Sequence, residues 1–89
     1  MIMNRSFTDN AWSDYLWLQK NDKKALKRVN DLIKETTRTP FKGIGKPEPL
    51  HGELSGYWSR RINQKDRLIY GVTKESLIII ACRTHYSDK

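Results

Sequence analysis

Apolar residues recur at helical spacing near the start of the chain, after a short mixed segment, MIMNRSF. Thr8 or Asp9 can cap the helix that this spacing predicts, because either side-chain oxygen can accept a hydrogen bond from a backbone N–H of the first turn. The segment before the cap predicts an opening strand. Four apolar residues of the helix follow at helical spacing: Ala11, Trp12, Tyr15 and Leu16.

A second amphipathic helix is expected after Asp22, whose side chain is a suitable cap. Its apolar positions share one side of a 3.6-residue wheel and should pack on the core: Ala25, Leu26, Val29, Leu32 and Ile33. The basic positions of this region project to the opposite side: Lys20, Lys23, Lys24, Lys27, Arg28 and Lys34. Such a face is ordinarily solvated, and contact with a phosphate backbone would be a secondary role.

A long loop is predicted between Thr39 and Gly56, because this stretch holds all three prolines and four of the five glycines. Its apolar residues favour a loop that is ordered against the core: Phe41, Ile44, Leu50 and Leu54.

Within that loop, the sequence GKPEPL places Glu48 between two prolines. Proline fixes its own φ and restricts the residue before it, so Lys46 and Glu48 are both expected to be extended. The loop around Glu48 should therefore be stiff. A stiff loop can be a mere connector, or it can hold one carboxylate in place for chemistry.

Three β-rich runs follow the loop: YWSRRIN, RLIYGV and SLIIIACRTHY, separated by the polar breaks QKD and TKE. Breaks of turn length between such runs predict three antiparallel strands. Two helices followed by a strand meander predict an α+β fold, in which both helices pack on one face of a small, mainly antiparallel sheet. The other face of the sheet should then be open.

Length and composition add limits to this picture. The 89 residues are enough for a single domain that spans 1–89. The longest apolar run, Leu77 to Cys82, is far below a membrane span, and no signal-peptide core follows the first residues, so a cytoplasmic location is expected. Cys82 is the only cysteine, which excludes an internal disulfide and favours a small buried apolar group.

The net charge of +7 favours a polyanionic partner, either a nucleic acid or an acidic protein segment, although a merely soluble basic protein fits the charge about as well. The cations of the β-rich part are Arg60, Arg61, Lys65, Arg67, Lys74 and Arg83. Arginines interleaved with aromatic residues suit RNA, because guanidinium groups bind phosphates and aromatic rings stack on bases. Trp58 and Tyr70 are more simply core residues, whereas Tyr86 is the better stacking candidate.

RNA cleavage requires a base for the ribose 2′-hydroxyl, an acid for the leaving oxygen and cations for the phosphate. The chain has only two histidines, His51 and His85, and it lacks HExxH, CxxC and acidic clusters. A metal-dependent nuclease is therefore poorly supported, and no metal or other cofactor is expected. One Glu, one His and several Arg are the minimum set for this chemistry, but a lone histidine near a strand end is more often structural or solvated.

A more specific indication of function is a family resemblance carried by four separated blocks: TRTPFKGIGKPEPL, LSGYWSRRI, RLIYGVT and ACRTHY. In this order and spacing they resemble the YoeB branch of the RelE-type toxins of bacterial toxin–antitoxin systems, from Trp12 to Tyr86. The resemblance implies a compact α+β ribonuclease fold and a ribosome-dependent endoribonuclease that cuts messenger RNA in the decoding site. It further implies metal-independent cleavage to a 2′,3′-cyclic phosphate, and inhibition by an antitoxin of the YefM or Phd type. Whether the free protein is a homodimer stays open.

The resemblance also assigns roles. It implies Glu48 as the general base, Arg67 as the phosphate-binding arginine and His85 as the general acid. Further residues are expected to bind the substrate: Arg61, Tyr86, His51 and Lys46. The position of His51 often carries Lys in the family, which makes this cationic edge weaker or pH-dependent. The chain also continues beyond Tyr86 with Ser87-Asp88-Lys89, where family members often end.

Two other classes fit the same charges. A non-catalytic basic nucleic-acid-binding module predicts tight, salt-sensitive binding without a cleaved product. A protein-interaction domain would use the arginines for an acidic peptide alone. A cleavage assay on translating ribosomes separates both from the enzyme.

Overall fold

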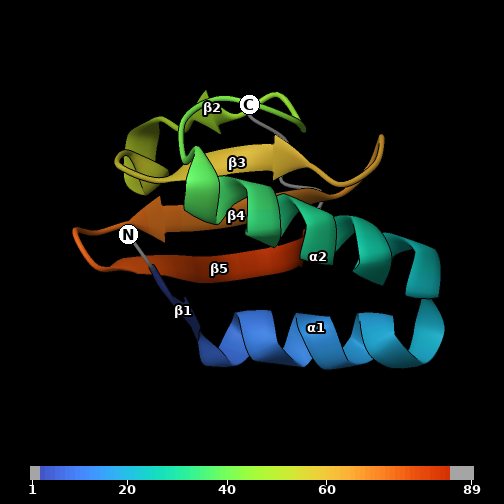
Figure 1. Cartoon of the computed structure of the whole chain (residues 1–89). Helices are drawn as coiled ribbons and strands as arrows, with labels where there is room; N and C mark the ends of the chain where they lie inside the picture. Colours follow the sequence, from blue (N-terminus) through green and yellow to red (C-terminus); the bar gives the residue numbers. More distant parts are fainter. Residues whose placement is uncertain (1–2, 85–89) are drawn as a thin grey trace.

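The sheet of the protein has five strands in the order β1-β5-β4-β3-β2 in the computed structural model, which describes residues 3–84. The strands are β1 (Asn4–Phe7), β2 (Glu48–Pro49), β3 (Trp58–Arg61), β4 (Arg67–Val72) and β5 (Ser76–Thr84). β1 is parallel to β5, and every other neighbouring pair is antiparallel (Figure 1). The predicted α+β class and mainly antiparallel sheet are confirmed, and the predicted opening strand forms one edge.

Two helices, α1 (Asp9–Asn21) and α2 (Lys23–Arg38), connect β1 to the loop before β2. The predicted caps are both present: Thr8 accepts a hydrogen bond from the N–H of Ala11, and Asp22 accepts one from the N–H of Ala25, each at 3.1 Å. The backbone N–H of Asp22 also closes the end of α1 by donating to Leu18. Because one residue separates the helices, the chain turns sharply between them, as Figure 1 shows.

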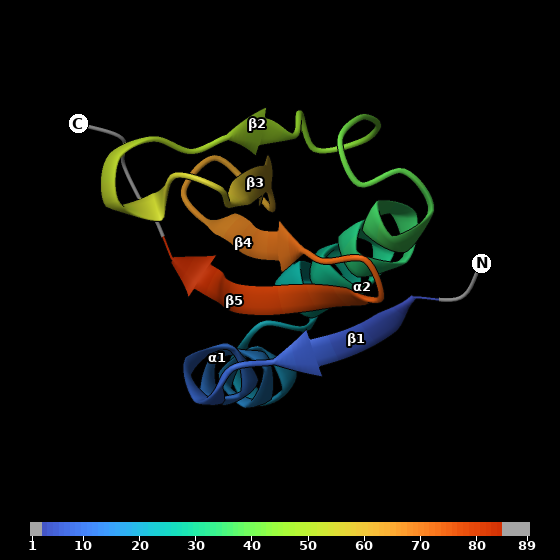
Figure 2. The ribbon, with the colours of Figure 1, turned by 90° about the vertical axis from the view of Figure 1, so that its left-hand side faces the viewer.

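The apolar residues that recur along α1 do not all face the core. Ala11 and Leu18 are buried, whereas Trp12 and Leu16 are 49% and 44% exposed. The helix lies along the β5–β1 edge of the sheet rather than flat across it (Figure 2), so only a narrow strip of it meets the core. Trp12 instead stacks on Tyr15, with ring centroids 5.7 Å apart.

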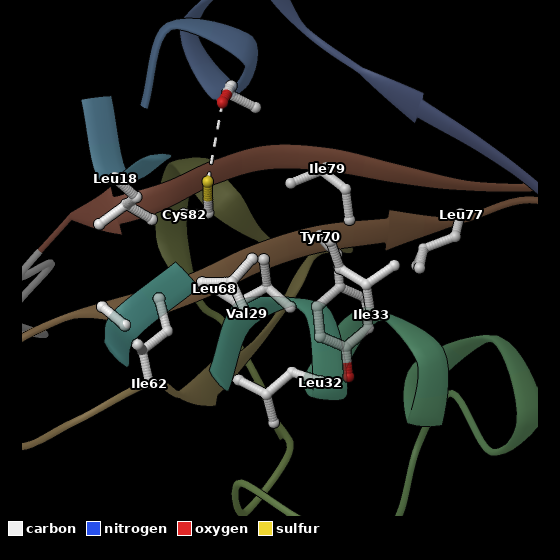
Figure 3. Packing of buried hydrophobic residues seen from close by; sticks show 12 residues of the cluster. Leu18, Val29, Leu32, Ile33, Ile62, Leu68, Tyr70, Leu77, Ile79 and Cys82 are labelled. Carbon is white, nitrogen blue, oxygen red and sulfur yellow. Dashed lines mark hydrogen bonds between the residues drawn. The ribbon is translucent and has the colours of Figure 1, made fainter. Parts of the chain in front are cut away.

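Both helices and one face of the sheet enclose the main core (Figure 3). Its labelled members are Leu18, Val29, Leu32, Ile33, Ile62, Leu68, Tyr70, Leu77, Ile79 and Cys82. Cys82 is fully buried, as predicted, and its thiol donates to the carbonyl of Ala11 over 3.6 Å. Burial, followed by the nearby Asp14 carboxylate, raises the pKa of the Cys82 thiol to about 12.

The opposite face of the sheet is less open than predicted. Leu50, Ile69 and Ala81 form a second buried cluster there. The chain between β2 and β3, which includes a short 3₁₀ helix, η1 (Gly52–Leu54), supplies Leu54 and Tyr57 to this cluster. The apolar residues after Pro49 therefore cover part of the face and leave the rest to polar side chains.

None of the helices within residues 3–84 is long and apolar enough to cross a membrane.

Candidate active site

Glu48 lies in β2, the short strand at one edge of the sheet. β2 pairs with β3 at two positions only, Glu48 with Ser59 and Pro49 with Trp58. Glu48 is extended as predicted, but Lys46 is not, because its φ is +50°. The carbonyl of Gly45 already accepts a hydrogen bond from the N–H of Arg61 at 2.7 Å.

The unexpected conformation of Lys46 follows from these contacts. The chain advances three residues from Gly45 to Glu48 while β3 recedes two, from Arg61 to Ser59, so one extra residue must be accommodated as in a β-bulge. Positive φ at Gly45 (+82°) and Lys46 absorbs it. This requirement overrides the local preference of a residue that precedes proline.

Arg67 of β4 is the side chain that Glu48 meets. Its Nη1 donates to the Glu48 carboxylate over 3.4 Å and to the hydroxyl of Ser59 over 3.2 Å. Ser59 is fully buried, so it offers a fixed anchor, while the Glu48 side chain is 55% exposed. The buried hydroxyl of Ser59 thus orients the guanidinium of Arg67, and the Glu48 carboxylate beside it is accessible from solvent.

Arg61 adds a second cation beside this pair. The register of β3 and β4 places Arg61 directly opposite Arg67. Like charges at opposed positions of a sheet destabilise it, and a bound anion removes that cost. A single carboxylate, that of Glu48, contacts the pair within the described residues. The arrangement therefore suits a phosphate group.

Lys46 and His51 are exposed at the two ends of the β2 region, and the structure gives neither side chain a contact with Glu48 or Arg67. His51 precedes η1 as its N-cap residue without a side-chain capping bond. His85 and Tyr86 lie outside the described residues, which end at Thr84, the register partner of Arg67.

Two of the cations expected to face RNA take other positions. Arg60 is fully buried on the core side of β3, since successive residues of a strand point to opposite faces. The guanidinium of Arg83 lies 3.5 Å from the ring centroid of Trp17 in α1. Register shifts between β4 and β5 allow Arg83 to reach this helix. Both arginines therefore have contacts within the fold.

The loop before β2 is held differently from the prediction. Phe41 and Ile44 are 53% and 43% exposed, so they do not pin it to the core, although Leu50 is buried as expected. Arg60 replaces them by binding the loop's carbonyl oxygens. The sequence predicted neither this loop-binding role of Arg60 nor the role of Ser59 in anchoring Arg67. Strand alternation, which puts Ser59 and Arg61 on one face and Arg60 on the other, was the available signal.

Within residues 3–84, no group of three or more His, Cys, Asp or Glu side chains is arranged to hold a metal ion.

Comparison with known proteins identifies the family. The model of the YoeB-like toxins of bacterial type II toxin–antitoxin systems matches residues 7–86. The chain belongs to the YoeB family. The toxin YoeB of Synechocystis sp. is 61% identical over 84 residues, which cover 94% of this chain and 98% of that toxin.

Solved structures of YoeB proteins agree with the fold. The YoeB dimer from Staphylococcus aureus has a TM-score of 0.90 and 44% identity, over 97% of this chain and 100% of that one. The heterotetrameric YoeB–YefM toxin–antitoxin complex from the same organism has a TM-score of 0.87 and 44% identity, over the same shares. Membership of the YoeB family, predicted from four sequence blocks, is thus confirmed.

Proposed function

We propose that the whole chain acts as one toxin domain, an endoribonuclease that cleaves messenger RNA in the ribosomal A site and thereby inhibits translation. The observation that carries the proposal is the contact of Arg67 with both Glu48 and Ser59 on an exposed part of the sheet. A carboxylate beside an oriented guanidinium is what abstraction of a hydroxyl proton next to a phosphate requires.

In the proposed reaction, the Glu48 carboxylate takes the proton from the ribose 2′-hydroxyl. The 2′-oxygen then bonds to the adjacent phosphorus, and the bond from phosphorus to the 5′-oxygen of the next nucleotide breaks. His85 donates a proton to that leaving oxygen. The products are a 2′,3′-cyclic phosphate and a free 5′-hydroxyl, and no water, metal or oxidant is consumed.

Arg67 stabilises the negative charge that develops on the phosphate. Negative charge grows on the non-bridging phosphate oxygens as the 2′-oxygen attacks, and a cation already in place stabilises it without reorganisation. The bond from Arg67 to buried Ser59 provides this orientation before RNA arrives. Arg61, opposite Arg67, binds the same or the next phosphate. Lys46, His51 and Tyr86 complete the substrate contacts.

We further propose a YefM-type antitoxin as the natural inhibitor and a homodimer as the free form. The S. aureus relative is known both as a YoeB dimer and as a YoeB–YefM complex. An antitoxin segment that is acidic and apolar would complement the Arg61–Arg67 pair and exclude the message.

The proposal is tested by single-turnover cleavage of message on programmed ribosomes. Glu48→Gln and His85→Gln should each slow cleavage by about 10²- to 10⁴-fold, the usual contribution of a general acid or base. Arg67→Ala should slow it at least as much. The matched control is Glu53→Gln, which neutralises another exposed carboxylate, in η1, and should leave the rate unchanged.

Ribosome binding should survive all these substitutions, because many other basic residues contribute to it. Thermal melts of each variant show that a slow variant is folded. If Glu48→Gln cleaved at nearly the rate of the unaltered protein, Glu48 would not be the base. If the unaltered protein bound programmed ribosomes and left the message intact, the non-catalytic binding module would be the better description.

A further inference from the structure

Arg60 makes the most extensive polar contacts of any buried side chain in the described structure. Its Nη2 donates to the carbonyls of Thr39 and Lys42, the latter at 3.0 Å, and its Nη1 donates to that of Ile44 at 2.9 Å. Its Nε donates to the hydroxyl of Tyr70 at 3.2 Å, and that hydroxyl donates to the carbonyl of Pro40 at 2.7 Å. Together the two side chains bind four carbonyl oxygens of the segment 39–44.

The stability of the core alone does not account for a charge at this position. Arg60 is 0% exposed, and its guanidinium has no carboxylate within salt-bridge distance among the described residues. Removing an unpaired charge from water is expensive, and well-packed apolar residues usually stabilise a core at least as well. What the guanidinium supplies is geometry, because its planar fork fixes several acceptors at once.

The carbonyl oxygens that Arg60 binds lie in the chain just before the proposed base, Glu48. Gly45 follows the last of them, and its carbonyl is held by the N–H of Arg61. Only Lys46 and Pro47 then separate the anchored segment from Glu48. β2 itself has two residues and pairs with β3 alone. Its downstream end is held by Leu50, which is buried and donates its N–H to the carbonyl of Tyr57 at 2.9 Å, so the anchored segment supplies the hold on the upstream end.

We infer that Arg60 is a positioning residue for cleavage: it holds the segment 39–44 and thereby keeps the Glu48 carboxylate beside Arg67. Ser59, which anchors Arg67, precedes Arg60 directly in β3 and points to the opposite face. One short strand thus fixes the two partners of the site from its two sides. The catalytic consequence of this inference rests on the proposed function, whereas its structural half does not.

Arg60→Lys is the decisive substitution. Lysine keeps the charge and most of the volume, but its single nitrogen lacks the fork that reaches three carbonyls. The segment 39–44 should become more mobile, and the Glu48 carboxylate should occupy a wider range of positions. A misplacement of about 1 Å can cost about 100-fold in rate, so we expect cleavage at saturating ribosomes to fall by about 10- to 100-fold, with ribosome affinity unchanged.

Hydrogen exchange tests the structural half without any use of activity. In Arg60→Lys, the amides whose hydrogen bonds hold the two ends of the segment should exchange faster: Thr39 N–H, which donates to Glu35, and Arg61 N–H, which donates to Gly45. Amides of α1 should not change. Two controls accompany it. Arg5→Lys makes the same chemical change at an exposed position of β1, and Leu18→Ala destabilises the core from α1. Neither control should change exchange at these two amides or the rate of cleavage, when measured where all the variants are folded.

A double-mutant cycle tests the catalytic half. If Arg60 acts through Glu48, Arg60→Lys should add no further loss of rate in the Glu48→Gln background. Rate losses that multiply in the double variant would overturn the inference. So would an Arg60→Lys variant that cleaves no more slowly than Leu18→Ala, or one in which hydrogen exchange is unchanged. A full rate for Glu48→Gln would instead refute the proposed base, and the exchange experiment would still decide whether Arg60 holds the loop.

Discussion

Gly45→Ala is the substitution for which the structure gives the sharpest expectation of lost stability. A Cβ atom at Gly45 would lie 2.8 Å from Cδ2 of Leu32 and 3.0 Å from Cβ of Arg60. Both neighbours are buried, and Arg60 is held by its carbonyl partners, so neither can move freely. Gly52 offers a matched control, since its φ is also positive (+67°) but nothing lies within 4 Å of its added Cβ.

Both alanine variants incur the cost of a side chain at positive φ, about 1–2 kcal/mol, which the smaller entropy of the unfolded chain offsets by about 0.4–1 kcal/mol. Only Gly45→Ala adds an overpacking cost, typically about 1–3 kcal/mol. We therefore expect Gly45→Ala to lower the free energy of unfolding by about 2–4 kcal/mol, and Gly52→Ala to lower it by about 1 kcal/mol or less.

Equilibrium unfolding in urea measures both values. Equal m-values establish that the two variants expose the same amount of surface on unfolding. The comparison between the two glycines isolates the contact term, because the backbone term is shared. Free energies of unfolding that agreed within about 0.5 kcal/mol for the two variants would refute the packing that we describe around Gly45.

Two buried groups give predictions on ionisation. Burial, partly opposed by Arg60, raises the pKa of Tyr70 above its ordinary value of 10.0, so the stabilisation that Tyr70 contributes at lower pH is lost as pH rises above 10. Denaturation from pH 8 to 11 should thus show a shallower alkaline loss of stability in Tyr70→Phe, and an equal slope would contradict it. The Cys82 thiol, with its pKa near 12, should react with iodoacetamide at pH 8 only in denaturant; equally rapid labelling of the native protein would show that it is accessible.

The helices were the most predictable elements, because their signals are local. Thr8 and Asp22 can satisfy a first turn from their own sequence neighbours, so the caps follow from the sequence. The buried face of α2 also follows, because Val29, Leu32 and Ile33 recur with the helical period. The face of α1 did not follow, because it depends on where that helix meets the sheet.

The contacts of the candidate site depend on pairings between distant segments. Sequence alone could name Glu48 and Arg67 through a family resemblance, but it could not show that Ser59 anchors Arg67, since strand register is not encoded locally. Arg60 was misplaced for a related reason. A strand arginine looks like a surface cation until the loop that surrounds it is seen, and that loop is separated from Arg60 by up to 21 residues.

The prolines beside Glu48 also determine what can bind at that edge of the sheet. An outer strand normally presents a row of backbone N–H and C=O groups on which a further strand can add. Pro47 and Pro49 have no N–H, so the segment 47–49 offers at most one donor to an incoming strand. The β2 edge is thereby protected from β-augmentation and aggregation. A ligand at this edge must be recognised through side chains, which suits a polyanion better than another polypeptide strand.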